Sequence, residues 1–270
     1  MKGSTPLLLL LALATLVAPA QANAALPTPG AHAGAPARWM PPARPTWQWQ
    51  LNGRLDTSVR AAVYDIDLFD HDAAMVAALH RTGRRVICYT SLGSLERFRP
   101  DVAGLPRAVA GRTLDGWPGE RWLDVRRLDV LGPWIERRLD SCRDKGFDAV
   151  EADNVDAYAN ASGFPLTAAD QLRFNRFLAR AAHARGLAIA LKNDLDQVAA
   201  LEPAFDLAVV EQCFEFDECD RLAPFTAAGK PVLVAEYRLP TARFCARANA
   251  AGLMAMRKRL ALGAWRRPCW

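Results

Sequence analysis

Residues 147–158, FDAVEADNVDAY, contain the pattern that decides the fold. A short apolar run carries Glu151 within it and ends at Asp153, and polar residues follow at once. Short runs rich in Val, Ile and Ala are typical of strands in a buried parallel sheet. Similar runs recur along the chain, so we predict strands at residues 61–67, 84–90, 147–153, 187–193, 206–212 and 231–237.

Longer segments with helical periodicity separate several of these strands. They cover residues 72–83, 128–146, 166–186 and 243–252. Thr167 and Asp170 resemble an N-terminal capping box, and Gly83 and Gly186 stand where two of the segments end. Strands and helices that alternate at this spacing predict a parallel sheet of the α/β class.

Two α/β architectures fit this alternation, a (β/α)8 barrel and an open doubly wound sheet. Open nucleotide-binding sheets usually carry a Gly-rich phosphate turn, and neither GxGxxG nor GxxxxGK[ST] occurs here. Acids instead follow strand after strand, as expected when the loops at the carboxyl ends form one pocket. We therefore expect a single TIM-barrel domain over residues 46–270.

The first 45 residues differ in composition from the rest. An apolar run after Lys2 ends near Pro19, and Ala22-Asn23-Ala24 fits the rule for signal peptidase, which predicts a signal peptide over residues 1–24. The run is shorter than the roughly 20 residues that span a bilayer, so we expect no stable membrane insertion, with an uncleaved anchor as the alternative. Residues 25–45, rich in Ala, Pro and Gly, predict a flexible linker. The mature protein is then secreted or periplasmic.

The chain has six Cys, an even number that predicts disulfides in an exported protein. Cys213–Cys219 and Cys245–Cys269 would close short loops and are the first pairs expected. For Cys88, in the apolar run RRVICYT, a buried free thiol and a disulfide both stay open. No CxxC pair occurs and the four His are scattered, so we expect no metal and no cofactor. An acidic metal site of Asp65, Asp67 and Asp153 is the alternative.

The formal net charge is +5, which raises the question of nucleic-acid binding. The Arg residues are spread singly and in pairs along helical segments, as on a solvated helical face. We therefore expect no nucleic-acid partner, and a monomer.

The acids at the strand ends are the main candidates for chemistry. Side chains alternate along a strand, so Asp153 and Glu211 can both point inward at the mouth of a barrel. Carboxyls gathered in a pocket shift each other's pKa, which leaves one as a proton donor and the other ionised, the pair that glycoside hydrolysis requires. For any single acid, helix capping or a loop salt bridge is the alternative. No GxSxG motif occurs, which argues against a serine esterase.

Aromatic residues near these loops are candidates for stacking on sugar rings. Three Trp are expected in the core instead: Trp47, Trp49 and Trp134. The candidates for stacking are Tyr64, Tyr89, Trp117, Trp122, Tyr158, Phe214 and Tyr237.

Several segments, in this order, resemble glycoside hydrolase family 114, whose members are endo-α-1,4-polygalactosaminidases on a TIM-barrel fold. The resemblance implies cleavage inside α-1,4-linked galactosamine-containing polysaccharide by a carboxylate pair. The matching segments are WQWQLNGRLD (47–56), VYDIDLFD (63–70), VICYTSLGS (86–94), GWPGERWLDVR (116–126), GFDAVEADNVDAY (146–158), LTAADQLRFN (166–175), LKND (191–194) and EQCFEFDEC (211–219).

The resemblance implies that Asp153 of ADN and Glu211 of EQC are the catalytic carboxylates. We expect Asp153 to be the nucleophile, because Asn154 lies beside it, and Glu211, with its longer reach, to be the acid/base. The side chains expected to bind substrate are Asp65, Asp67, Tyr89, Asn154, Lys192, Asn193, Glu236 and Tyr237.

This chain departs from the family at three places. It has ADN where PDN is more frequent, DAY where DGY is usual, and TSLGS where SAGS is common, which puts loop shape and subsite preference in doubt. Residues 211–220, EQCFEFDECD, hold five acids, which suit a cationic galactosamine polymer. An inactive barrel that binds carbohydrate without cleaving it is the alternative function.

Overall fold

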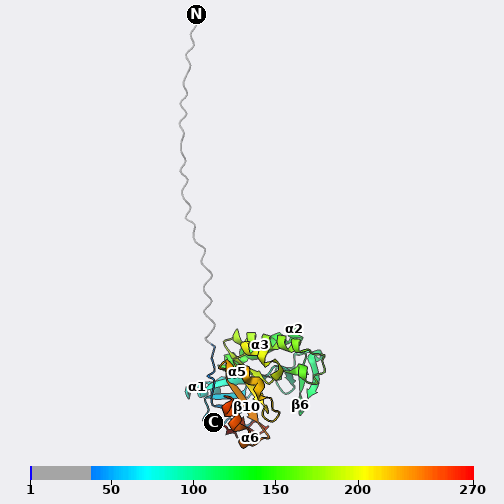
Figure 1. Cartoon of the computed structure of the whole chain (residues 1–270). Helices are drawn as coiled ribbons and strands as arrows, with labels where there is room; N and C mark the ends of the chain where they lie inside the picture. Colours follow the sequence, from blue (N-terminus) through cyan, green and yellow to red (C-terminus); the bar gives the residue numbers. More distant parts are fainter. Residues whose placement is uncertain (2–37) are drawn as a thin grey trace. The chain divides into compact units, whose positions relative to one another are not determined.

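The computed structural model describes residue 1 and residues 38–270 (Figure 1). The predicted signal peptide, after its first residue, and the predicted linker up to residue 37 lie outside the described residues. At the end of that linker, Arg38 Nη2 lies 3.1 Å from Asp206 Oδ1, and Trp39 packs against the inner core. Packed structure is therefore present from Arg38 onward, upstream of the predicted domain start.

Eight parallel strands follow one another in chain order in the central sheet, and a short antiparallel strand, β12, pairs with the last of them. All six predicted strands are among the eight; the first and the last, β1 and β11, were not predicted. The parallel strands are β1 (Trp47–Gln50), β2 (Val63–Asp67), β3 (Arg85–Ser91), β7 (Ala149–Asp153), β8 (Ala188–Lys192), β9 (Leu207–Glu211), β10 (Val232–Glu236) and β11 (Met254–Arg257), and β12 is Arg267–Pro268.

The sheet curls around a filled interior to which all eight parallel strands contribute side chains. Trp47 Nε1 donates a hydrogen bond to the carbonyl oxygen of Met254 at 2.8 Å, which joins the first parallel strand to the last. The large rings of Trp47 and Trp49 face small residues from the other strands, so the interior is filled as in a TIM barrel. The inner cluster consists of Trp47, Trp49, Val63, Ile87, Ala149, Ala188, Ala190, Leu207, Val209, Leu233, Ala235, Met254 and Met256.

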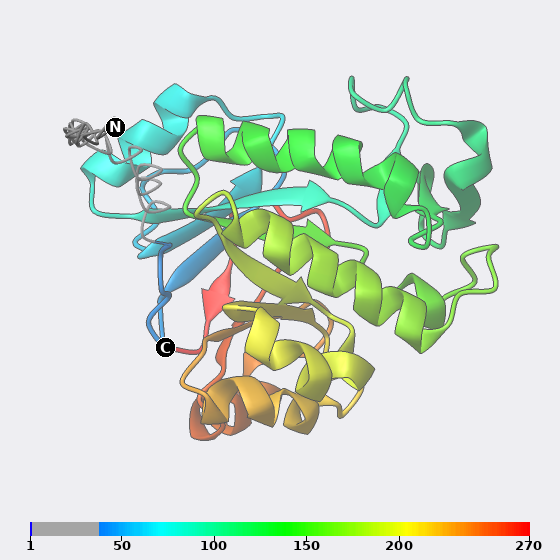
Figure 2. The same ribbon diagram turned by 90° about the horizontal axis from the view of Figure 1, so that it is seen from above.

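The predicted helices form, and short ones accompany them. Thr167 and Asp170 make the predicted capping box at the start of α3, and α2 and α3, in green and yellow-green, lie side by side against the sheet (Figure 2). None of the helices in residues 38–270 is long and apolar enough to cross a bilayer. The helices are α1 (Ala73–Arg81), α2 (Leu128–Asp144), α3 (Ala168–His183), α4 (Val198–Leu201), α5 (Ala223–Ala227) and α6 (Thr241–Ala250), with 3-10 turns η1 (Arg107–Val109), η2 (Ala157–Ala159), η3 (Leu195–Gln197), η4 (Glu202–Ala204) and η5 (Cys219–Leu222).

A small antiparallel sheet, which the sequence pattern did not predict, is inserted after β3. It consists of β4 (Ser94–Glu96), β5 (Ala110–Leu114) and β6 (Trp117–Leu123), with β6 in the middle. Gly116, at φ +79°, makes the tight turn between β5 and β6, a conformation that favours glycine. The insertion brings residues of the GWPGERW segment to the carboxyl end of the barrel.

Three disulfides are present. Cys213–Cys219 and Cys245–Cys269 confirm the two expected pairs. The third, Cys88–Cys142, links β3 to α2, so the free-thiol alternative for Cys88 is wrong. The sequence gives no signal for this pair. Cys88 lies in an apolar run, both cysteines are fully buried, and 54 residues separate them.

Candidate active site

A cavity of about 570 Å³ lies at the carboxyl ends of the parallel strands, where the barrel hypothesis expects a site. Its lining is strongly acidic: seven carboxylates face only two cations, Arg99 and Lys192. The carboxylates are those of Asp67, Asp70, Glu96, Glu120, Asp153, Asp156 and Glu211.

Eight of the ten residues predicted for the site line this cavity. The other two, Asp65 and Glu236, are fully buried and do not reach the cavity wall. Asp65 lies one layer below Asp67 on β2, and Glu236 accepts a hydrogen bond from the backbone N–H of Phe214 at 2.8 Å. Their positions therefore do not indicate direct contact with a substrate. The eight are Asp67, Tyr89, Asp153, Asn154, Lys192, Asn193, Glu211 and Tyr237.

The buried ammonium of Lys192 connects the acids at the cavity floor. Its Nζ lies 2.9 Å from Asp153 Oδ1, 3.0 Å from Glu211 Oε2 and 3.4 Å from Glu151 Oε1. Burial disfavours its charge, but Asp153, Glu211 and Glu151 outweigh burial and raise the pKa of Lys192 well above its ordinary value. Lys192 is therefore a fixed positive charge.

Asp153, at the end of β7, is surrounded by donors. The hydroxyl of Tyr89 donates to Oδ2 at 2.6 Å, and Lys192 and the backbone N–H of Asn154 donate to Oδ1 at 2.9 and 2.8 Å. Burial would raise the pKa of Asp153, but Lys192 and Tyr89 overcome it and hold that pKa below its ordinary value. Asp153 is therefore an ionised carboxylate, and the three hydrogen-bond donors around it stabilise its negative charge.

Glu211 lies at the end of β9, two strands from Asp153. Its Oε1 accepts a hydrogen bond from the hydroxyl of Tyr237, and its backbone N–H donates to Asn193 Oδ1 at 3.0 Å. The Glu211 side chain is 24% exposed and that of Asp153 15%, so Glu211 has the freer access to the cavity. The two carboxylates differ in environment, as a proton donor and a nucleophile must.

The chain turns abruptly after each of these strands. Asn154, Asn193 and Gln212 follow β7, β8 and β9 directly and have φ values of +62°, +51° and +58°. Residues other than glycine adopt this left-handed conformation at a cost, which Asn bears most easily. Each turn ends its strand at the residue that faces the cavity: Asp153, Lys192 or Glu211.

Two buried acids with raised pKa values, Glu151 and Asp65, lie beneath this floor. Burial raises the pKa of Glu151 to about 7, against the attraction of Lys192. Burial and the adjacent Glu151 raise the pKa of Asp65 well above its ordinary value. Glu151, two residues before Asp153 on β7, contacts Lys192 through Oε1. Asp67 is paired with Arg99, and the part of the chain that the structure describes has no group of three or more Asp, Glu, His or Cys side chains able to hold a metal ion, so Asp65, Asp67 and Asp153 do not form the alternative metal site.

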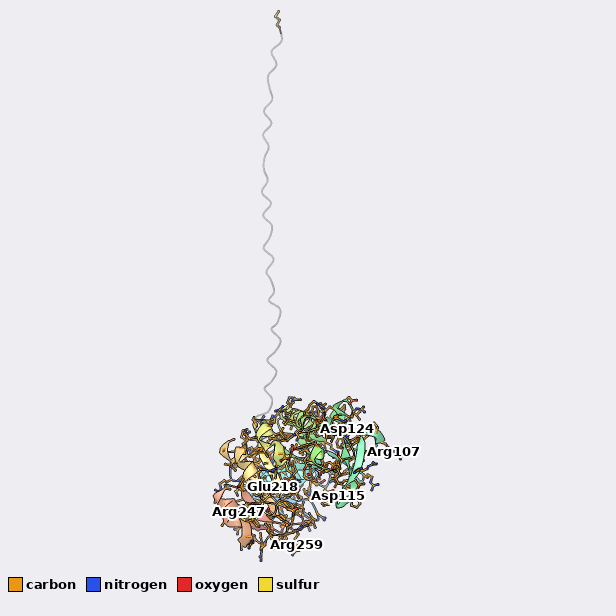
Figure 3. The ribbon with its side chains drawn as sticks, turned by 45° about the vertical axis from the view of Figure 1, so that its right-hand side comes forward. Arg107, Asp115, Asp124, Glu218, Arg247 and Arg259 are labelled. Carbon is orange, nitrogen blue, oxygen red and sulfur yellow. A yellow bond between two sulfur atoms is a disulfide. The ribbon has the colours of Figure 1, made fainter. Side chains whose placement is uncertain are left out.

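Two smaller cavities continue the first. One of about 190 Å³ shares Trp117, Asn154 and Asn193 with it, and one of about 330 Å³ shares Asn193 and Glu211. Asp115 and Glu218, both labelled in Figure 3, line the second and third cavities. Together the cavities form a groove longer than a single sugar site.

The stacking candidates fall into two groups. Tyr89, Trp117 and Tyr237 line the main cavity, and Tyr158 lines the third. Tyr64 is fully buried, and its hydroxyl donates to a backbone carbonyl, so it is not available to substrate. Trp49, expected in the core, is buried but also borders the main cavity.

Sequence inspection missed Glu120 and Arg99. Glu120 comes from β6, and its Oε2 accepts a hydrogen bond from Ser94 Oγ at 2.8 Å. Burial raises the pKa of Glu120 to about 7. Arg99 follows β4 and pairs with both Asp67 and Glu96. Neither residue lies at the end of a barrel strand, so the pattern of acids at strand ends could not indicate them. The one signal in the sequence is that Glu120 belongs to the matching segment GWPGERW.

The chain was also compared with known proteins. A model of glycoside-hydrolase family GH114 matches residues 28–270. Ega3 of Aspergillus fumigatus, in a complex with galactosamine, has a similar structure: 40% identity over 86% of this chain and 98% of the other, with a TM-score of 0.82. The glycoside hydrolase domain of PelA from Pseudomonas aeruginosa shares the fold at 16% identity, over 82% and 98% of the two chains, with a TM-score of 0.64. A comparison with curated sequences gives no match.

Proposed function

The chain belongs to glycoside hydrolase family GH114, and from this premise we propose that it cleaves α-1,4-linked galactosamine-containing polysaccharide internally, with Asp153 and Glu211 as its catalytic carboxylates. Membership makes it an O-glycoside hydrolase. The observation that carries the finer proposal is the pair of carboxylates held on either side of one buried lysine, at the floor of an acidic groove.

In the first step, an Asp153 oxygen attacks the anomeric carbon and forms a covalent bond to it. The bond from that carbon to the glycosidic oxygen breaks, its electron pair stays on the oxygen, and Glu211 supplies the proton. Three donors stabilise Asp153 as an anion, which suits a nucleophile, and the more exposed Glu211 suits the proton donor.

In the second step, water attacks the anomeric carbon, Glu211 takes the proton from that water, and Asp153 leaves as the free carboxylate. The distances to Lys192 support this two-step course. Since Nζ lies 2.9 Å from Asp153 Oδ1 and 3.0 Å from Glu211 Oε2, these two oxygens are no more than about 6 Å apart, which is compatible with the roughly 5–5.5 Å between the carboxyl groups of retaining enzymes. We expect retention of anomeric configuration.

Two features support a cationic polymer as the substrate. The groove lining is acidic, and its three connected cavities suit a chain bound through several units. Ega3, at 40% identity, has a structure in a complex with galactosamine. Export to an oxidising compartment is supported by the three disulfides and by the predicted signal peptide.

The proposal is tested with Asp153→Asn and Glu211→Gln on a defined α-1,4-linked galactosamine polymer. We expect the release of new reducing ends to fall by about 10²–10⁴-fold in Glu211→Gln and at least as far in Asp153→Asn, because each removes a group that acts in the transition state. Circular dichroism should show an unchanged fold.

Glu136→Gln, on an exposed part of α2, makes the same chemical change away from the groove and should retain full activity. Full activity in either cavity variant would contradict the assignment. Binding of the polymer by the wild type, with no cleavage at any pH between 4 and 8, would favour a carbohydrate-binding barrel instead.

A further inference from the structure

The carboxylate of Asp156 makes no ion pair and no capping hydrogen bond in the described residues. Asp156 stands at the N-cap position of η2, but its side chain makes no capping hydrogen bond. The nearby Asn160 amide donates to the main-chain oxygen of Asp156 at 3.0 Å. The same amide is close enough to the Asp156 carboxylate to lower its pKa, and within residues 38–270 no cation lies within salt-bridge distance of this carboxylate.

The other acids of the main cavity, apart from the catalytic pair, are engaged. Asp67 and Glu96 are paired with Arg99, and Asp70 also lies within 3.9 Å of that guanidinium. Glu120 is held by Ser94. Asp156 is thus the acid in the cavity lining whose acceptor capacity is left for a ligand.

Asp156 also stands where the cavities meet. It lines all three of them, a position that it shares with Asn193. Asn193 uses its side-chain oxygen on the backbone of Glu211, so Asp156 is the ionisable group at this junction. A polymer that occupies more than one of these cavities therefore passes close to Asp156.

Each free galactosamine unit carries an ammonium group, and an ammonium that meets an unpaired carboxylate makes a charge-assisted hydrogen bond. We propose that Asp156 is a specificity-determining residue: it accepts a hydrogen bond from the ammonium of a galactosamine unit in the groove and so favours free-amine units over N-acetylated ones. This inference rests on the proposed function. Burial and the charge of Asp153 raise the pKa of Asp156 to about 6, so it is mostly ionised at neutral pH and available to a cation.

The test compares Asp156→Asn with the wild type on two α-1,4-linked galactosamine oligomers of equal length, one with free amines and one fully N-acetylated. We expect kcat/KM on the free-amine oligomer to fall by at least tenfold, because a hydrogen bond to a charged group is worth about 1.5–3 kcal/mol. On the N-acetylated oligomer it should change by less than about twofold. Tm should change little, because the substitution keeps the size of the side chain and removes neither an ion pair nor a helix cap.

Asp70→Asn is the matched control, because it removes the same charge from the exposed rim of the same cavity. A loss in Asp70→Asn as large as in Asp156→Asn would overturn the proposal, since the whole acidic field would then be responsible. An equal loss on both oligomers, or no loss on either, would overturn it as well.

Calorimetric binding of the same two oligomers separates this inference from the proposed function. If the wild type cleaves neither oligomer, the proposed function fails, and selectivity is then measured as the ratio of the two dissociation constants. A ratio that collapses at least tenfold in Asp156→Asn supports the role of Asp156, and an unchanged ratio overturns it. If the wild type cleaves the free-amine oligomer and Asp156→Asn keeps its selectivity, the inference fails and the proposed function stands.

Discussion

At the scale of single residues, the charge of the cavity floor depends on Lys192. Its ammonium contacts Asp153, Glu211 and Glu151, and its Nζ lies 5.1 Å from the centre of the Trp49 ring. A buried ion is tolerated only when its partners are well placed, and removing one partner leaves the others uncompensated. The lysine is therefore required for both the stability of the site and the ionisation of Asp153.

Lys192→Met is expected to lower the free energy of unfolding by about 3–5 kcal/mol at pH 7, because it leaves buried carboxylates without a counter-ion. Lys192 has a raised pKa, so its contribution is complete below its unfolded pKa of about 10.4 and is lost only at higher pH. The depressed pKa of Asp153 adds stability above about pH 3.9 that is lost as the pH falls through the folded value.

In the variant, the carboxyls lose their cation and should bind protons at higher pH than in the wild type. The stability deficit should therefore shrink between pH 7 and pH 5, as measured by urea unfolding. Arg247→Met, which breaks an exposed pair with Asp217, is the control and should cost less than about 1 kcal/mol. A deficit in Lys192→Met that is the same at both pH values would contradict this account of the floor.

Alternation along the strands explains which of these residues could be predicted from sequence. Ala149, Leu207 and Val209 lie in the inner cluster, so Asp153 and Glu211 face inward as predicted. The same rule applies to Glu236: Leu233 and Ala235 are inside, so Glu236 points the other way. The depth of a side chain below the cavity is harder to predict from sequence. Asp65 and Asp67 share one face of β2, and they differ only in how far along the strand they lie. A pattern gives the face of a strand but not the height of the pocket floor.

At the scale of elements, the small sheet β4–β6 shapes one side of the groove. Its residues lack a clear strand pattern, and the pairing of β5 with β6 is irregular, with two register shifts. It places Trp117 between the main and second cavities and Glu120 beside Asn154. Sequence predicts the barrel because its strands must bury apolar residues, whereas an inserted sheet with exposed faces carries no such signal.

Trp117 is 50% exposed and lines two cavities, which suits a ring that stacks on a sugar. Trp117→Ala should raise KM for a long galactosamine polymer by about 2–13-fold, from the loss of about 0.5–1.5 kcal/mol of stacking, with kcat little changed. Steady-state kinetics on polymers of two lengths measures this. Trp265→Ala removes an exposed Trp that lines none of the cavities and should leave KM unchanged. A lower kcat at constant KM would assign Trp117 to another role.

At the scale of the whole molecule, charge is divided between the groove and the rest of the surface. The chain carries a formal net charge of +5, yet the main cavity has seven carboxylates against two cations. Screening limits exposed charges to about 8 Å at physiological salt, so a bound substrate experiences the groove more than the distant surface. A basic protein can in this way bind a cationic polymer.

This division predicts how salt affects binding. Raising the ionic strength from about 0.05 to 0.5 M should weaken binding of a free-amine galactosamine oligomer several-fold, because the attraction of the groove is screened. Binding of the N-acetylated oligomer, which is neutral, should not change. Calorimetry with Asp153→Asn, which limits cleavage during the titration, measures both constants. If net charge governed binding instead, added salt would relieve repulsion and strengthen binding of the free-amine oligomer. The sign of the salt effect therefore decides between the groove and the net charge of the molecule.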